Sequence, residues 1–394
     1  MKKFLIFLIF LSLFLTGCWD RRELNELAIT LAFGIDKVED EYQITAQVVV
    51  PSEVSMKAST GRSSVTLFKA RGKTVYEAIR KITKESPRKV YPGHLRMLVI
   101  GEELAKEGIG ESLELLARDW ELRSDFYVAI AKDATAEELL NVTTTIESIP
   151  ANKMFNTLRS SENSWAGTNG ITLDELIEDL ISEGKEAVLT GVMVIGDQEL
   201  GSSKQNVESI TPAARIVYDE LAVFKKDKLV GWLTEIESRG YNAITNQLKT
   251  TVSSISCPET GKATIEIIDF KSEIKGKVKN GSPEVDIQSH VNANVGAVEC
   301  PIDLTKLETF DNLEKTFEKE VKVTFEESIE TLKEFEVDIF GFGEAIHRSN
   351  PKEWEKMKET WGDEFPHVKV NITIDAKLRR SGTIDNSFLE KLKD

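Results

Sequence analysis

In "VTLFKARGKTVYEAIRKITKES" (65–86), the sequence passes from the pattern of a strand to that of a helix. Residues 65–72 predict a β-strand, and residues 74–86 predict a helix directly after it. The alternation continues with a strand, a helix and a strand at 94–101, 102–120 and 126–133. Strands that alternate with helices of this length are typical of βαβ units, so we predict an α/β layer in the first part of the chain.

Two strands precede this stretch, at 26–37 and 42–51, and an acidic turn joins them. The polar, Gly/Ser-containing residues 52–64 predict a loose loop, and we expect a second one at 160–170, around Trp165. Loops of this kind often carry binding residues, so both are candidates for contact with a partner. Two helices open with capping boxes, formed by Thr135 with Glu138 and by Thr172 with Glu175.

A domain boundary is predicted in the polar run 197–215, close to Pro212. We therefore expect an N-terminal α/β domain at 18–200, with room for two subdomains, and a C-terminal domain at 210–385. The composition and length of the chain without its leader fit two or three folded domains.

The second region predicts a hairpin, three strands and a long helix. Turn sequences separate the strands. Apolar residues recur every three or four positions between Leu304 and Phe335, which predicts one long helix with a core-facing stripe. A further helix opens at Asn350-Pro351. The predicted hairpin, the three strands and a closing strand lie at 220–237, 249–257, 263–278, 284–299 and 366–382. This pattern favours an α+β domain, with an antiparallel sheet covered on one face by helices.

The chain opens like an exported lipoprotein. Two lysines precede the apolar run 4–15, which is shorter than the ~20 residues of a membrane span and fits a signal-peptide core. "LTGC" (15–18) matches the bacterial lipobox. Membership of that class implies removal of residues 1–17, with S-diacylglycerol and N-palmitoyl groups on Cys18. The alternative is an ordinary secreted protein in which Cys18 is a free or paired thiol.

Acyl chains on Cys18 would hold the body at a membrane, because each buried methylene contributes about 0.8 kcal/mol. No later apolar run in the sequence approaches the length of a span, so we expect attachment through lipid alone. Trp19 and the pair Arg21 and Arg22 follow directly, and they either contact lipid headgroups or form a plain tether.

Charge and cysteine content limit the function further. Loss of Lys2 and Lys3 with the leader changes the formal charge from −16 to −18, which argues against binding to nucleic acid. Export makes a disulfide bond between Cys257 and Cys300 permissible, but two free thiols remain the alternative. Two cysteines cannot complete a zinc site. The four histidines are scattered along the sequence, at His94, His290, His347 and His367. We therefore expect no metal or cofactor.

Motifs of catalysis are missing from the sequence, which has no nucleophile elbow, zinc-protease motif, phosphate loop or paired-cysteine redox motif. We interpret "GFGEAI" (341–346) as a turn between two helices rather than a dinucleotide loop. His94 is interpreted as a hydrogen-bonded structural histidine rather than a catalytic one. The sequence therefore predicts no enzymatic activity.

Three segments resemble the Ger(x)C lipoproteins, the C subunits of nutrient germinant receptors in spore-forming bacteria. They are "GCWDRRELNELAI" (17–29), "SPRKVYPGHLRMLVIGEELAKEGI" (86–109) and "FGFGEAIHRSNPKEWEKMKETWGDEFPHVKVNITIDAKLRRSGTI" (340–384). The resemblance implies a multidomain body without known enzymatic activity. It also implies a complex with two integral membrane subunits, one related to amino-acid transporters, at the inner membrane of the dormant spore. Of the family's residues only the lipid-bearing position transfers, and here it is Cys18.

Two hypotheses follow. The first is a non-enzymatic receptor subunit, held by lipid on the extracytoplasmic face of the membrane and docked to its membrane partners. The alternative is a solute-binding lipoprotein of a transporter, which usually has two similar α/β lobes around a ligand cleft. The predicted halves differ in class, and this disfavours the alternative. A cell-wall hydrolase, a third class, lacks a visible acid/base or metal constellation.

Overall fold

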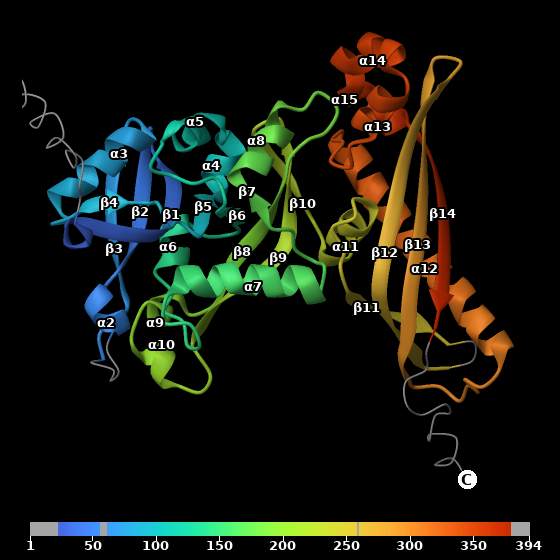
Figure 1. The fold of residues 1–394 in the computed structure, drawn as a ribbon, viewed down its shortest axis with the longest axis horizontal. Helices are drawn as coiled ribbons and strands as arrows, with labels where there is room; N and C mark the ends of the chain where they lie inside the picture. The colour runs from blue at the N-terminus through green and yellow to red at the C-terminus, as the bar shows by residue number, and fades with distance from the viewer. Residues whose placement is uncertain (1–22, 56–60, 258–259, 380–394) are drawn as a thin grey trace, which may run out of the picture.

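The structure is a computed structural model that describes residues 23–55, 61–257 and 260–379. Within these ranges the chain forms a ten-stranded sheet and a four-stranded sheet, at opposite ends of an elongated molecule (Figure 1). The predicted fold class is confirmed, because an α/β part precedes a second sheet that is packed by helices. The leader and Cys18 lie outside the described residues.

The ten-stranded sheet has a parallel centre with an antiparallel hairpin on each side. Its order is β10-β9-β8-β6-β5-β1-β2-β3, with β4 paired to β1 and β7 to β6. Strands β1, β5, β6 and β8 run parallel to one another. The strands are β1 (Leu27–Val38), β2 (Glu41–Val49), β3 (Val65–Gly72), β4 (Lys89–Tyr91), β5 (Met97–Gly101), β6 (Tyr127–Ala131), β7 (Ile171–Thr172), β8 (Val188–Gly196), β9 (Ala214–Lys225) and β10 (Lys228–Leu233).

Helices cover both faces of this sheet, because its central strands are apolar on both sides. On one face α3, α4, α5 and α8 pack against residues such as Phe33 and Ile100. On the other face α6 and α7 pack against residues such as Met97 and Val99. The helices of this part are η1 (Leu24–Glu26), α2 (Pro51–Ser55), α3 (Val75–Lys81), η2 (Ile82–Lys84), α4 (Glu102–Glu107), α5 (Gly110–Arg118), α6 (Ala136–Leu140), α7 (Pro150–Ser164), α8 (Leu173–Ile181), α9 (Gln198–Gly201) and α10 (Gln205–Glu208).

The helix predicted at 102–120 is in fact two helices, α4 and α5. Gly108 ends α4 with a φ of 136°, a conformation that favours glycine. At the start of α5, the side chain of Asp227 accepts a hydrogen bond from the backbone N–H of Gly110 at 3.2 Å. Asp227 lies far along the chain, between β9 and β10, so the local pattern of apolar residues could not reveal this contact.

Strands β9 and β10 belong to the first sheet, whereas the boundary predicted near Pro212 placed them in the second region. Side chains on β9 alternate between the two hydrophobic cores. Ala222 and Phe224 pack into the core of the first sheet. Leu221 and Val223 pack into the core of the second part. A strand that is buried on both sides is shared by the two parts, so a change in polarity could not mark where one ends.

The second sheet has the order β11-β12-β13-β14. Strands β11, β12 and β13 are antiparallel, as predicted, but β14 runs parallel to β13. A parallel partner requires a long crossover, and here four helices and two short 3-10 turns supply it. The elements are β11 (Thr251–Ser256), β12 (Lys262–Lys279), β13 (Ser282–Val298), β14 (Lys369–Leu378), α11 (Glu235–Ile244), α12 (Leu307–Phe335), α13 (Phe342–Ser349), α14 (Pro351–Met357), η3 (Lys358–Thr360), α15 (Trp361–Glu364) and η4 (Phe365–His367).

The long helix α12 lies along one face of this sheet (Figure 1). Most of its apolar stripe is in the core, where Phe317, Phe325 and Leu332 are at most 1% exposed. Leu307, at the first turn, is 83% exposed and lies outside the core. The stripe is therefore a packing surface, as its spacing predicts.

Cys257, after β11, and Cys300, after β13, are joined by a disulfide bond, with Cα atoms 6.5 Å apart. The two residues are 43 positions apart in the sequence. A cross-link over such a distance restricts the unfolded chain and so favours the folded state.

Replacing both cysteines by alanine should lower the free energy of unfolding by about 2–4 kcal/mol, since the unfolded chain regains its freedom. Urea denaturation of the wild type and the double variant measures this difference. Wild-type protein treated with a reductant serves as the control and should behave like the variant. Equal stability of all three samples would show that the bond does not form.

Candidate functional site

The prediction of a loose loop at 160–170 is wrong, because this segment is partly helical and packs against the rest of the protein. Helix α7 extends into it, and Ala166, Thr168 and Asn169 are at most 3% exposed. The side chain of Asn242, on α11, donates to the carbonyl oxygens of Ala166 and Thr168 at 2.8 and 3.1 Å. The segment therefore connects the two parts of the molecule and is not a flexible linker.

Trp165, in the middle of this segment, also contacts the second part. Its indole N–H donates to Glu235 Oε1 at 2.9 Å, and its carbonyl oxygen accepts from the Thr251 hydroxyl at 2.8 Å. Of the other predicted loop, 52–64, the structure shows that α2 occupies the beginning and that residues 56–60 lie outside the described ranges.

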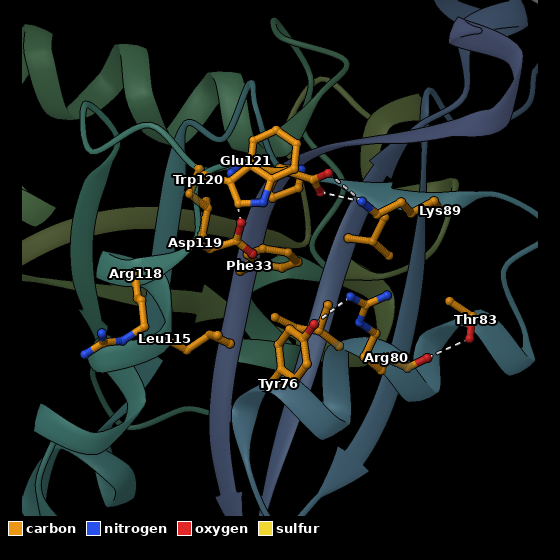
Figure 2. Close-up of a pocket in the computed structure, with 14 residues that line it drawn as sticks. Phe33, Tyr76, Arg80, Thr83, Lys89, Leu115, Arg118, Asp119, Trp120 and Glu121 are labelled. Atoms are coloured by element: carbon orange, nitrogen blue, oxygen red, sulfur yellow. Dashed lines mark hydrogen bonds and ion pairs between the residues drawn. The ribbon is translucent and has the colours of Figure 1, made fainter. Parts of the chain in front are cut away.

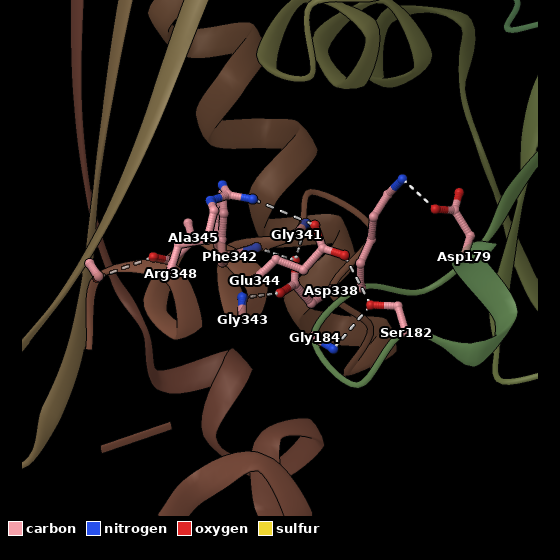
Figure 3. A network of polar contacts seen from close by, with 12 residues as sticks. Asp179, Ser182, Gly184, Asp338, Gly341, Phe342, Gly343, Glu344, Ala345 and Arg348 are labelled. Atoms are coloured by element: carbon pink, nitrogen blue, oxygen red, sulfur yellow. Dashed lines mark hydrogen bonds and ion pairs between the residues drawn. The ribbon is translucent and has the colours of Figure 1, made fainter. Parts of the chain in front are cut away.

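A second connection, which we call the junction, is formed by residues 182–187 and 338–344 (Figure 3). The first segment links α8 to β8, and the second links α12 to α13. Their backbones bond directly, because Glu186 N donates to the carbonyl oxygen of Asp338 at 2.8 Å and Glu344 N donates to that of Gly184 at 3.2 Å. The Ser182 hydroxyl adds a hydrogen bond to Glu344 Oε1 at 3.0 Å.

Asp338 organises the second segment of the junction. Its carboxylate is 3% exposed and accepts four hydrogen bonds. Oδ1 accepts from the backbone N–H groups of Gly341 and Phe342 at 3.0 and 3.1 Å. Oδ2 accepts from Gly343 N at 2.8 Å and from the indole of Trp361 at 3.0 Å. Burial raises the pKa of Asp338 to about 6, although these donated hydrogen bonds oppose the change.

Of residues 341–346, interpreted as a turn between two helices, only Gly341 lies in the connection between α12 and α13, and residues 342–346 already belong to α13. Gly341 has a φ of 75°, and α13 starts at the next residue. The side chain of Asp338 acts as the helix cap, because it accepts hydrogen bonds from the N–H groups of Gly341, Phe342 and Gly343, which lie three to five positions downstream. This turn positions the second segment of the junction.

The two segments of the junction approach too closely for any side chain at Gly184. A Cβ atom there would lie 2.6 Å from Glu344 N and 2.8 Å from the carbonyl carbon of Gly343. Beside it, the Lys185 ammonium lies 2.7 Å from Asp179 Oδ1, with both side chains half-buried. The junction is thus a tightly packed polar contact between the two parts.

A groove of about 350 Å³ lies on the first part, between β4, α3 and the segment that follows α5 (Figure 2). We call it the β4 groove. Phe33, Val90 and Leu115 are among its apolar lining residues. At its mouth the indole of Trp120 is 79% exposed. The exposed tryptophan beside an apolar hollow makes the β4 groove a candidate interaction surface.

Charged residues line the rim of the β4 groove. The Lys89 ammonium lies 2.6 Å from both carboxylate oxygens of Glu121. Arg80 donates to the hydroxyl of Tyr76 at 2.6 Å, and its guanidinium carbon lies 5.0 Å from the centre of the Tyr76 ring. The basic run 80–89 is visible in the sequence, but the sequence pattern alone did not reveal this groove.

The histidines do not assemble a site. His94 is exposed and lies edge-on to Tyr91, with ring centres 6.2 Å apart, so its interpretation as a hydrogen-bonded structural residue is not supported. His290 lies 3.2 Å from Asp375 on an exposed strand surface, and His347 stacks on Trp354. Among the described residues, no group of three His, Cys, Asp or Glu side chains could hold a metal ion.

Two family models match the chain. The spore germination protein N-terminal domain matches residues 20–194, and the C-terminal model, spore germination B3/GerAC like, matches residues 219–382. Spore germination protein KC of Bacillus subtilis (strain 168) is 32% identical over 389 residues, which cover 96% of each chain. Spore germination protein B3 of the same organism is 24% identical and covers 95% of this chain and 96% of its own.

The crystal structure of the GerBC protein has the same fold. It superposes with a TM-score of 0.54 over 88% of this chain and 96% of that chain, at 18% identity. Together these matches define a class of spore germination proteins. The chain belongs to the B3/GerAC-like family, the Ger(x)C family that its sequence motifs resemble.

Substituting Asp338→Asn should lower the free energy of unfolding at pH 7 by about 2–3 kcal/mol. The amide nitrogen would face the N–H groups of Gly343 and Trp361, which would lose their acceptor. Denaturant unfolding measures the loss, and Asp363→Asn, on an exposed position of α15, is the matched control.

Comparison of the wild type with Asp338→Asn also tests the ionisation of the Asp338 carboxyl. Its pKa is about 6 in the folded chain against an ordinary value of 3.8, so the unfolded chain releases the proton first. Wild-type stability contributed by this group is therefore lost as the pH rises from about 4 to about 6. The stability difference between wild type and Asp338→Asn should narrow over that interval, and a difference that widens would contradict the raised pKa.

Gly184→Ala should destabilise the chain by about 1–3 kcal/mol, because the added Cβ meets backbone atoms that cannot rotate away. Thermal unfolding and limited proteolysis would report the loosened junction. In Gly362→Ala, the control, the new Cβ has no neighbour within 4 Å, so this helical position should be unaffected or slightly more stable. If the two variants had equal thermal stability and equal resistance to proteolysis, the two segments of the junction could move apart without loss of stability.

Proposed function

We propose that this chain is a lipid-anchored, non-enzymatic subunit of a spore nutrient germinant receptor. The observation that carries the proposal is the end-to-end match to spore germination protein KC, together with the lipobox that ends at Cys18. Several relatives that match along nearly their whole length are also named as spore germination proteins. The described residues contain no helix that is long and apolar enough to cross a membrane.

The proposed location is the extracytoplasmic face of the spore inner membrane. S-diacylglycerol and N-palmitoyl groups on Cys18 would hold the body there. The proposed partners are two integral membrane subunits, one of them transporter-like. Confinement to a shared surface raises the effective concentration of the partners toward each other, so even a weak docking contact becomes populated.

The structure supports a body that docks as one unit. The junction, the segment around Trp165 and the shared strand β9 tie the two parts together through buried contacts. A lipid at the amino end would then fix the position of the whole body. Docking of one surface to a membrane subunit would transmit a displacement to the far end of the molecule.

The alternative, a solute-binding lipoprotein, fits the architecture poorly. Such proteins usually have two similar α/β lobes that close over a ligand. Here a mixed ten-stranded sheet and a four-stranded sheet differ in topology, and buried side chains of one strand contribute to both cores. Micromolar binding of an amino acid or sugar to the isolated body, measured by calorimetry, would favour the alternative.

Cys18→Ala should leave an uncleaved precursor or a protein that is released from the membrane. Flotation of spore membranes after a high-salt wash measures attachment. The Cys257→Ala, Cys300→Ala variant is the control, because it removes two cysteines and leaves the anchor. Cys18→Ala protein that has lost residues 1–17 and is still attached like the wild type would contradict the anchor. Affinity purification of the wild type should also recover the transporter-like subunit, and recovery of the chain alone would contradict the proposed complex.

A further inference from the structure

One segment of this acidic protein is strongly basic. The chain carries a formal charge of −16, yet residues 73–89 contain six basic and two acidic side chains. The segment includes α3, η2 and the first residue of β4, and its residues Arg80 and Lys89 line the β4 groove. The basic residues are Lys73, Arg80, Lys81, Lys84, Arg88 and Lys89, and the acidic residues are Glu77 and Glu85.

Part of this charge is free to meet a ligand. Lys81 and Lys89 are paired with Glu77 and Glu121. Lys84 and Arg88, by contrast, are exposed, and neither forms an ion pair with another described residue. Two unpaired cations and Arg80 therefore face solvent in a molecule whose net charge is negative.

Aromatic side chains accompany these cations. Trp120 stands at the mouth of the β4 groove, and Tyr76 lies beside Arg80 (Figure 2). Tyr76 is 47% exposed. Exposed tryptophan and tyrosine with neighbouring lysine and arginine are typical of surfaces that lie in the headgroup region of a bilayer.

This surface lies where the chain approaches its lipid. Strand β4 pairs with the first residues of β1, and Lys89 is opposite Leu27. The exposed Leu24 lies in η1, directly before β1. Glu23 is five positions after Cys18, and an extended chain spans at most about 3.6 Å per position, so Glu23 lies within about 18 Å of the lipidated position.

We propose that this surface, formed by Tyr76, Arg80, Lys84, Arg88 and Trp120, lies against the anionic surface of the membrane that holds the lipid. The two aromatic side chains enter the headgroup region, and the three cations lie against lipid phosphates. This proposal rests on the lipid anchor described under the proposed function. The short tether and the complementary charge favour a bilayer over an anionic surface of a protein partner.

The test uses the full lipidated chain on vesicles of phosphatidylcholine with and without phosphatidylglycerol. Trp120→Cys introduces a single free thiol, because Cys18 is lipidated and Cys257 and Cys300 are paired. An environment-sensitive fluorophore on this thiol should shift to shorter wavelength when anionic lipid is present. The control is Ile268→Cys, a 48% exposed position on β12, which should stay in water.

Charge neutralisation supplies a second measurement. Lys84→Gln and Arg88→Gln should each lower the ratio of docked to undocked protein about fivefold, since a basic residue near an anionic surface contributes ~1 kcal/mol. Lys271→Gln and Lys275→Gln, on exposed positions of β12, are the matched controls and should leave the fluorescence unchanged.

The outcomes separate the two proposals. Protein that fails to float with the vesicles contradicts the anchor. Protein that floats while the label at position 120 stays in water overturns the docked surface and leaves the anchor intact. A wavelength shift that requires the membrane subunits and not anionic lipid also overturns it, because the surface would then bind a protein partner.

Discussion

The buried carboxylate of Asp338 determines how the two parts of the molecule meet. Four N–H groups converge on it, and they fix the backbone of residues 341–343 and the first turn of α13. That turn then presents Gly343 and Glu344 to Gly184, where the two backbones come within direct bonding distance. A charge buried in this way needs every one of its partners, because an unpaired buried ion is strongly unfavourable.

The junction, the segment around Trp165 and the shared strand together make the molecule one body with two different ends (Figure 1). At one end, β4 and the basic segment lie beside the first residues of β1. At the other end, the four-stranded sheet and α12 form the part farthest from β4. With the basic surface against a bilayer, the second sheet extends away from the lipid. The predominance of acidic residues elsewhere in the chain favours this orientation, since like charges repel the rest of the body from anionic headgroups.

The sequence predicted the local structure well where one element sufficed to explain the pattern. The capping boxes at Thr135 and Thr172 are confirmed, as are the strands of the α/β part and the core-facing stripe of α12. The prediction failed where distant residues decide the structure. Polar residues at 160–170 suggested a flexible loop, but the distant side chain of Asn242 donates hydrogen bonds to the backbone oxygens of Ala166 and Thr168.

The candidate site shows the same limit. The basic run that includes Lys84 and Arg88 is visible in the sequence, but only the pairing of β4 with β1 places the end of this run beside the first residues of β1. Asp338 is one of many acidic residues in the chain, and nothing local distinguishes it as a buried helix cap. The parallel addition of β14 is likewise a matter of topology, because an alternating strand pattern is the same for either direction.

The alternation of β9 between two cores has a consequence for folding and truncation. While only the residues up to β8 have folded, the sheet still has an open edge, and that edge stays unpaired until β9 and β10 join it. Leu221 and Val223 then remain uncovered until the second part folds against them. Folding of the first part is thus completed only by the second. A fragment that ends within the polar run 197–215 would expose the unpaired edge of β8 and would not be an independent domain.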